Sequence, residues 1–447
     1  MTTVTLALAM VAMAASLLPS AAVKAQVRMT VPPQSEAVAL RGATIHTVTN
    51  GVIENGTILF ENGVIRAVGT DVEIPAGTRV VDVSGKHIYP GLIDAYSTVG
   101  ISEIGSVDVS SDVNELGDFN PNVRAEVAVN AESRHIGTTR SAGVLVSLTT
   151  PEGGLISGMS SAMSLEGWDW EEMSIESTAA LNVNWPNPNS RGGRGGRGGR
   201  GFGPGPQESP PTYAGQVQQL KDFFAEARAY RDATTAGEEV RTDSRYAAMI
   251  PALDGEIPVV VSADGAAQIN DAITWGQEEG VRLVIRGGGD AIHVADRLAA
   301  NDIPVILTST MAAPGRDYEG YDGAYTMPAR LHEAGVKFAI SGGSGALYTN
   351  RLPWEAGVAV AFGLPEEEAL KAVTINAAEF MGISDQVGSL EPGKQATLLI
   401  TTGTPLDMTS DIEQSYIQGR EIDMNDIQKH FFEKYMEKVR QNRRVVS

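Results

Sequence analysis

The sequence predicts an α/β protein: a (β/α)8 TIM-like barrel with a small composite β-sandwich domain built from both ends of the chain. Apolar runs of strand length alternate with helical patterns through the middle of the chain, which is typical of βα units around a parallel sheet. Short β-branched runs fill residues 37–90, and a similar pattern returns at 388–423. With 447 residues, 42% of them apolar, the chain can bury a large core.

The prediction of short strands in residues 37–90 rests mainly on the turns between them. Asn50-Gly51, Asn55-Gly56 and Asn62-Gly63 separate the strand-like runs, and Asn and Gly both tolerate the positive φ of tight hairpins. Gly turns also join the runs of residues 388–423. We therefore expect short strands in both regions, and the family resemblance given below implies that they form one small domain.

The barrel is predicted over residues 91–387. Seven strand-like runs are found at residues 91–97, 144–148, 174–185, 257–263, 282–286, 303–307 and 336–341. A barrel of this type has eight strands, so we expect the missing one between Trp185 and Asp254. Helices are predicted at residues 267–279, 291–300 and 366–381.

A last helix is predicted over residues 424–447. Apolar residues recur there at spacings of three and four, at Met424, Ile427, Phe431, Tyr435 and Val439. This spacing indicates one apolar face, which we expect to pack on the body of the protein.

The first 25 residues resemble a secretory signal peptide. Residues 4–19 are an apolar run, and small residues follow with possible cleavage after Ala22 or Ala25, although the usual positive segment before the run is missing. A membrane anchor is the alternative, but the run is shorter than the ~20 residues that span a bilayer, and Pro19 ends it. We expect a periplasmic or secreted protein without a membrane span after cleavage.

Charge and cysteine content exclude several functions. The formal charge is −21, which repels phosphate backbones and anionic lipid, so no nucleic-acid partner is expected. The chain has no cysteine and hence no disulfide, thiolate metal site or cysteine nucleophile.

Residues 187–212 interrupt the barrel pattern with an Arg-Gly-Gly repeat and are predicted to be a disordered loop. An RNA-binding segment is an alternative that the acidic, exported chain disfavours. Its four Arg residues could instead contact an acidic partner surface.

Three motifs resemble the amidohydrolase superfamily. Pro-Gly-Leu-Ile-Asp-Ala at residues 90–95 resembles the entry into its barrel, and residues 388–398 resemble its Gly-Ser-Leu-Glu-x-Gly-Lys segment. Residues 351–378 look like the helical region that follows strand eight in imidazolonepropionase-like members. The resemblance implies hydrolysis of non-peptide C–N bonds by a metal held at the C-terminal rim of the barrel.

The positions where the family carries metal ligands hold other residues here. From strand one to strand eight these are Tyr96, Thr98, Ser262, Arg286 and a glycine at Gly342 or Gly343. The six histidines lie elsewhere, in the β-domain or in helix-like segments. We therefore predict no metal and no other cofactor, unless ligands exist that the motifs do not reveal.

A pocket at the barrel rim remains possible, because TIM barrels bind ligands at the C-terminal ends of their strands. The residues predicted there are Asp94, Tyr96, Ser97, Thr98, Ser262, Asp264, Arg286, Asp290 and Ser341. For Arg286 we favour an ion pair with Asp264 or Asp290, since a buried cation needs a partner. The alternative is that Arg286 clamps a substrate carboxylate.

A serine-hydrolase site can be tried at residues 342–346 or 158–162, but neither has a full nucleophile-elbow pattern, and both are interpreted as Gly-rich loops.

The sequence leaves two functional hypotheses. As the resemblance implies, we expect an exported member of the amidohydrolase superfamily whose activity is lost or altered. The alternative is an inactive pseudoenzyme that binds a small molecule or serves as a partner subunit, in a homo-oligomer or with an active relative.

Overall fold

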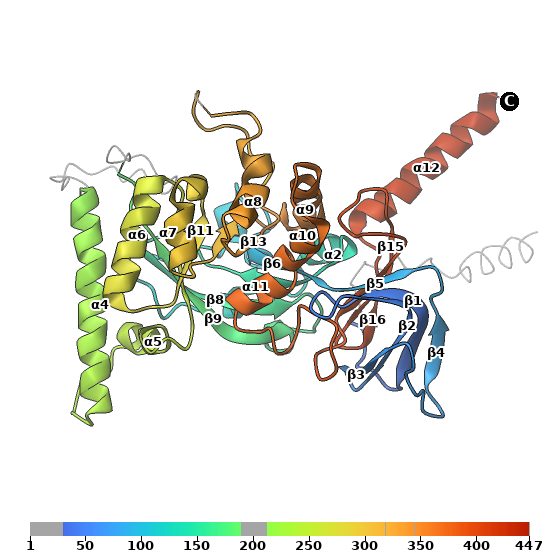
Figure 1. The fold of residues 1–447 in the computed structure, drawn as a ribbon, viewed down its shortest axis with the longest axis horizontal. Helices are drawn as coiled ribbons and strands as arrows, with labels where there is room; N and C mark the ends of the chain where they lie inside the picture. The colour runs from blue at the N-terminus through green and yellow to red at the C-terminus, as the bar shows by residue number, and fades with distance from the viewer. Residues whose placement is uncertain (1–29, 189–211, 318, 344, 447) are drawn as a thin grey trace, which may run out of the picture. The chain divides into compact units, whose positions relative to one another are not determined.

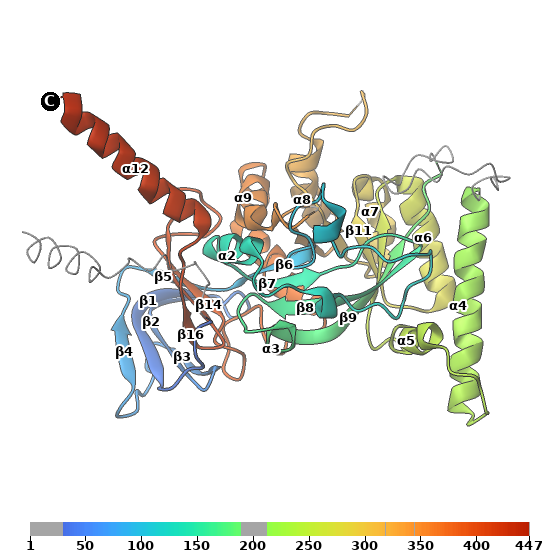
Figure 2. The same ribbon diagram turned by 180° about the vertical axis from the view of Figure 1, so that it is seen from behind.

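The structure, a computed structural model, describes residues 30–188, 212–317, 319–343 and 345–446. The expected signal peptide and nearly all of the predicted Arg-Gly-Gly loop lie outside these residues. Figures 1 and 2 show the chain from its two sides.

One eight-stranded sheet joins the two ends of the chain. Its strands are β1 (Val38–His46), β2 (Val52–Glu61), β3 (Val64–Gly69), β4 (Arg79–Asp82), β5 (His87–Pro90), β14 (Leu398–Thr401), β15 (Ile412–Ile417) and β16 (Arg420–Ile422). The order is β16-β15-β14-β5-β1-β2-β3, with β4 paired to β1. The antiparallel pair β5–β14, in which Pro90 faces Leu398, links the early strands to the late ones (Figure 2).

A second eight-stranded sheet forms a nearly closed, TIM-like barrel. Its strands are β6 (Leu92–Ser97), β7 (Val144–Thr149), β8 (Ile156–Ser164), β9 (Ser174–Asn184), β10 (Val259–Ala263), β11 (Leu283–Gly287), β12 (Val305–Leu307) and β13 (Phe338–Ile340), in that spatial order. Every neighbouring pair is parallel except those of β8, which runs antiparallel to β7 and β9 (Figure 2). The outer strands meet where the Ser341 hydroxyl donates to the Tyr96 carbonyl at 2.7 Å.

The predicted position of the eighth strand is wrong. That strand is β8, and the stretch between Trp185 and Asp254 contains the helices α4 (Tyr213–Thr235) and α5 (Ser244–Leu253) instead. All nine residues of β8 are buried, so its small Ser, Gly and Ala side chains give no alternation of polar and apolar residues. At Gly158 a Cβ atom would lie 2.7 Å from the Val123 carbonyl oxygen, so this supposed Gly-rich loop is a closely covered strand.

Helices cover the outer face of the barrel in its second half. They include α6 (Ala266–Glu279), α7 (Ala295–Ala300), α8 (Gly323–Glu333), α9 (Leu352–Ala361), α10 (Glu366–Ala372) and α11 (Ile375–Phe380). The single helix predicted at residues 366–381 is broken between α10 and α11. The break frees the Val373 carbonyl to accept the Ile93 N–H at 2.8 Å, and this bond satisfies a backbone group of the first barrel strand.

Alternate residues of the barrel strands build two cores. Val260, Val284 and Ile306 belong to the cluster inside the barrel, whereas Val259 and Leu283 belong to the cluster under the helices. This alternation fixes which side chains at the strand ends point into the mouth of the barrel.

The C-terminal helix forms, but its predicted packing is wrong. Helix α12 spans Ile427–Val446, and its side chains from Gln428 to Asn442 are exposed, with Phe432 at 67% and Tyr435 at 57%. Only its start is held, where Ser141 at the end of α2 (Arg134–Ser141) donates to Asp426. Among the helices of the described residues, none combines the length and apolarity needed to cross a membrane.

A buried ion pair ties α2 to the segment that follows β8. Arg140, 1% exposed, pairs with Glu166, which also accepts the Val31 N–H at 2.9 Å. Removing one partner of such a pair leaves the other charge buried without a partner. We predict that Glu166→Gln lowers the free energy of unfolding by about 3 kcal/mol.

Equilibrium denaturation measures this change. The matched control is Glu278→Gln, which removes the exposed ion pair to Lys221 and should cost less than about 1 kcal/mol. Equal effects of the two substitutions would contradict the account.

Candidate functional site at the barrel mouth

Three neighbouring strands present polar side chains in register at the barrel mouth. Asn184 at the end of β9 faces Ser262 of β10, and Ser262 faces Arg286 of β11. Ser262 and Arg286 stand two residues beyond Val260 and Val284 of the inner core, and Asn184 is in register with Ser262, so all three lie above that core. Their order in the sheet brings together residues that are far apart in the sequence.

Arg286 is the central group of this mouth. Its side chain is only 6% exposed, and its guanidinium stacks on the Tyr96 ring, 4.3 Å from the ring centre. Its Nη2 donates to the Asn184 Oδ1 atom at 3.3 Å. The other terminal nitrogen, Nη1, is buried without a hydrogen-bond partner among the described residues.

Asn184 is held so that its oxygen faces Arg286. Its Nδ2 lies 3.2 Å from the Gly153 carbonyl, 3.0 Å from the Gly154 carbonyl and 2.9 Å from the Ser157 hydroxyl. Because both carbonyls can only accept, the amide nitrogen must be on that side. The loop between β7 and β8 therefore sets the polarity of the group that contacts the guanidinium.

Tyr96 provides the face on which Arg286 rests. Its hydroxyl donates to Glu152 in the same β7–β8 loop. Burial raises the pKa of Tyr96; the nearby Arg286 opposes this shift, and Glu152 adds to it. The phenol is therefore neutral near pH 7, and its ring attracts the cation through its π face.

The expected ion pairs of Arg286 do not form. Asp290 instead binds Arg316 through two contacts of 2.9 and 3.0 Å, and it also accepts the Ala266 N–H at 3.1 Å. Asp264 is exposed, and no ion pair joins it to Arg286 in the described chain. Thus the interpretation that Arg286 has a structural acidic partner is wrong.

The reason lies in the turn that follows Arg286. Gly287 and Gly288 have φ values of +99° and +67°, which side-chain-bearing residues rarely adopt, and they turn the chain sharply at the end of β11. A Cβ atom on Gly287 would lie 2.4 Å from the Asp264 Oδ1 atom, so the Asp264 carboxylate lies over this backbone. The turn directs Asp290 toward Arg316.

Another group of predicted residues closes the seam between β6 and β13. Asp94 accepts the Tyr96 N–H at 3.1 Å and the Gly342 N–H at 3.4 Å, and the Thr98 hydroxyl accepts the Ala346 N–H at 2.9 Å. The Ser97 hydroxyl forms a hydrogen bond with the Thr349 hydroxyl, and the Ser341 hydroxyl donates to the Tyr96 carbonyl. These groups satisfy one another, so the seam uses them for structure.

Sequence reasoning missed Asn184, Glu152 and Glu355. Asn184 ends a buried strand, which is a signal that could have identified it. Glu355 is buried at the start of α9 and accepts the Thr310 N–H at 2.6 Å and its hydroxyl at 2.7 Å, beyond the end of β12. No spacing of residues in the sequence reveals Glu152 or Glu355, because their partners come from distant parts of the chain.

The mouth does not fit a divalent metal. Its strand ends offer a phenol, an amide, a hydroxyl and a guanidinium; the guanidinium is always cationic and has no lone pair to donate. Within residues 30–446, apart from the undescribed gaps, no three His, Cys, Asp or Glu side chains lie close enough together to hold a metal ion. His46 and His87 contact each other at 3.0 Å, but in the other sheet.

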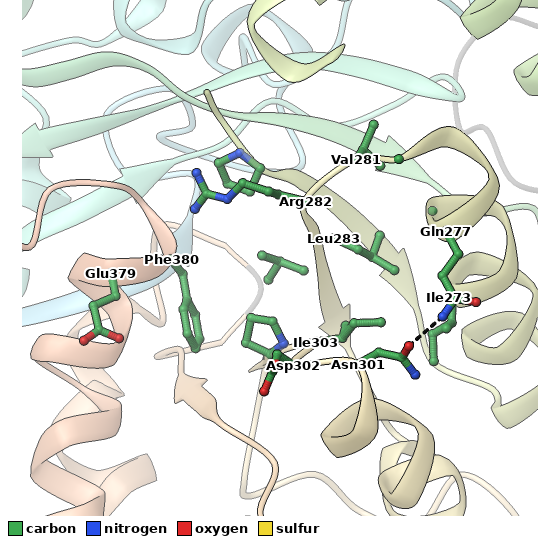
Figure 3. Close-up of a pocket in the computed structure, with 15 residues that line it drawn as sticks. Ile273, Gln277, Val281, Arg282, Leu283, Asn301, Asp302, Ile303, Glu379 and Phe380 are labelled. Atoms are coloured by element: carbon green, nitrogen blue, oxygen red, sulfur yellow. Dashed lines mark hydrogen bonds between the residues drawn. The ribbon is translucent and has the colours of Figure 1, made fainter. Parts of the chain in front are cut away.

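A separate hollow of about 390 Å³ lies at the opposite, N-terminal ends of β10, β11 and β12. Figure 3 shows Arg282 and Glu379 on one side of it and the Gln277–Asn301 hydrogen bond on the other. Arg282 donates to the Glu256 carbonyl at 3.2 Å, and Glu379 pairs with Lys337. Arg282 and Glu379 thus have protein partners, and this end of a TIM barrel is usually concerned with stability.

Asp94 makes stability depend on pH. Burial raises its pKa from 3.8 to about 7 in the folded protein. Between these values the folded chain keeps a proton that the unfolded chain has released, so Asp94 makes stability fall as pH rises, by at most about 1.4 kcal/mol per pH unit.

We predict that Asp94→Asn removes this contribution, because an amide resembles the protonated acid and does not titrate. When melting temperatures are measured from pH 4.5 to 7.5, the melting temperature of the variant should rise relative to that of the wild type as pH rises. A constant difference between the two proteins over this range would refute the assignment.

Comparisons with known proteins agree with this architecture. Residues 321–429 match the model of the Amidohydrolase family. An imidazolonepropionase of Geobacillus kaustophilus is 25% identical over 387 residues, covering 78% of this chain and 84% of the relative. An imidazolonepropionase of Rhodococcus jostii is 24% identical, covering 83% of this chain and 86% of the relative. A solved amidohydrolase structure from Thermotoga maritima has a TM-score of 0.76 and 27% identity, covering 86% of this chain and 99% of the other. The chain belongs to the amidohydrolase superfamily and is imidazolonepropionase-like.

Proposed function

We propose that this protein is an exported, catalytically inactive superfamily member that binds a small carboxylate-bearing molecule at Arg286. The observation that carries the proposal is the buried Nη1 atom of Arg286, which lacks a hydrogen-bond partner in the described residues. Loss of metal-dependent hydrolysis follows from a cation at a strand end where the family resemblance places a metal ligand. Export rests on the apolar N-terminal run alone.

The energetics favour an anionic ligand. A buried cation without a counter-charge costs several kcal/mol, so its retention in a barrel mouth needs a compensating interaction. A carboxylate can accept two parallel bonds from one guanidinium, a geometry that Arg provides and Lys does not. Asn184 and Tyr96 already fix the plane of the guanidinium, which lowers the entropy cost of binding.

We also infer that the mixed sheet is the family's small β-sandwich domain. Residues from both ends of the chain, among them Leu40, Phe60, Leu398 and Tyr416, share one buried cluster. Such a cluster is what a sheet that folds over itself would enclose.

The ligand proposal predicts opposite effects of one substitution on the free and the bound protein. Arg286→Met removes the uncompensated charge, so the free protein should melt at a higher temperature than the wild type. It should also abolish ligand stabilisation, which for the wild type reaches about 2.7 kcal/mol at a ligand concentration 100 times Kd.

The measurement is thermal unfolding of the mature protein with a panel of N-acetyl amino acids and dicarboxylates, followed by calorimetry of any compound that stabilises it. Arg282→Met is the matched control, because Arg282 lies before the same strand at the other end of the barrel and is exposed. It should leave ligand binding unchanged. Stabilisation of the Arg286 variant by the same carboxylates would overturn the proposal.

A further inference from the structure

Helix α12 carries an apolar face that no part of the described chain covers. Its exposed apolar residues are Phe431, Phe432, Tyr435, Met436 and Val439. Their spacings of one, three and four place them on one half of the helix surface. An aromatic-rich face of this kind is costly to leave in water and marks a contact surface.

The same helix is basic within an acidic protein. Ile427–Val446 contains six Lys and Arg against two Glu, whereas the whole chain has a formal charge of −21. Lys434 and Lys438 border the apolar face on one side, and Lys429 and Arg440 border it on the other. A surface that fits α12 must therefore be both apolar and acidic.

Such a surface exists on this chain, in the segment 103–118 after the first barrel strand. Five acidic residues and no Lys or Arg occur in it. Its exposed apolar side chains include Ile104, Val107, Val109 and Leu116, and the latter two are each 96% exposed.

The segment is tied to the barrel by backbone hydrogen bonds. The Asp112 N–H donates to the Ile101 carbonyl at 2.8 Å, and the Glu152 N–H donates to the Val113 carbonyl at 2.6 Å. Its apolar side chains are thus displayed on a fixed backbone, which reduces the entropy lost on binding.

We propose that α12 of one copy docks on residues 103–118 of a second copy, and that the reciprocal contact completes a two-fold dimer. Both surfaces are exposed within one copy, and two copies related by a two-fold axis cover both at once. Aromatic side chains carry roughly 150–250 Å² each, and 45–67% of the surface of Phe431, Phe432 and Tyr435 is exposed. Counted on both partners and with the neighbouring apolar side chains, two such contacts reach the lower part of the range of about 1,200–2,000 Å² typical of stable interfaces. The opposite charges select this partner over a like-charged contact.

Two variants separate the contacts. In the helix variant, Phe432→Glu with Tyr435→Glu, the apolar face is interrupted; in the loop variant, Val109→Lys with Leu116→Lys, the docking surface is changed. All four side chains are exposed, so folding should be unaffected. The control Met408→Lys changes an exposed apolar residue elsewhere and should behave as the wild type.

Light scattering after size-exclusion chromatography tests the proposal with the full mature chain. The wild type should be a dimer at micromolar concentration, with a dissociation constant that rises at high salt, and each variant alone should be a monomer. An equimolar mixture of the two variants should form dimers, because the intact helix of the loop variant meets the intact loop of the helix variant.

Three results would overturn the proposal. These are a monomeric wild type at 100 μM, a dimer that survives in either variant, and a mixture of variants that stays monomeric. Phosphatidylglycerol vesicles serve as a further probe. A wild-type monomer that binds them through α12, with binding lost in the helix variant, would identify a lipid surface as the occupant instead.

Discussion

The buried guanidinium of Arg286 is the interaction on which the rest of the barrel mouth depends. Its charge is stabilised by stacking on the Tyr96 ring and by a hydrogen bond to the Asn184 amide oxygen. Both of these groups are fixed by the loop between β7 and β8. Neither contact supplies a negative charge. The mouth is therefore arranged around a cation that the described protein only partly satisfies, and this arrangement favours an anion as its partner and disfavours a divalent metal.

The barrel itself does not depend on a metal for closure. Asp94, Thr98 and Ser341 bond across the seam between β6 and β13, and Val373 reaches the first strand through the break between α10 and α11. Polar side chains at the strand ends can thus hold the fold while the residues that would carry the family's chemistry change. Membership of a superfamily and retention of its activity are separate questions in such a fold.

Much of this architecture was predictable, because strand length, Asn-Gly turns and family motifs are local signals. The errors arose where the deciding contact comes from elsewhere. Strand β8 has no alternating pattern because it is covered on both faces, and the partner of Asp290 is chosen by the Gly287–Gly288 turn. Periodicity revealed that residues 427–446 form an amphipathic helix, but it could not reveal what covers the apolar face.

A crystal structure of the protein grown with both Zn²⁺ and an N-acetyl amino acid would test the central claim most directly. Anomalous scattering locates zinc, and the density map locates the carboxylate. The account predicts a carboxylate oxygen at about 2.7–2.9 Å from the Arg286 Nη1 atom and no zinc among Tyr96, Asn184 and Ser262. Zinc bound at these strand ends, with Arg286 turned away from the mouth, would contradict it.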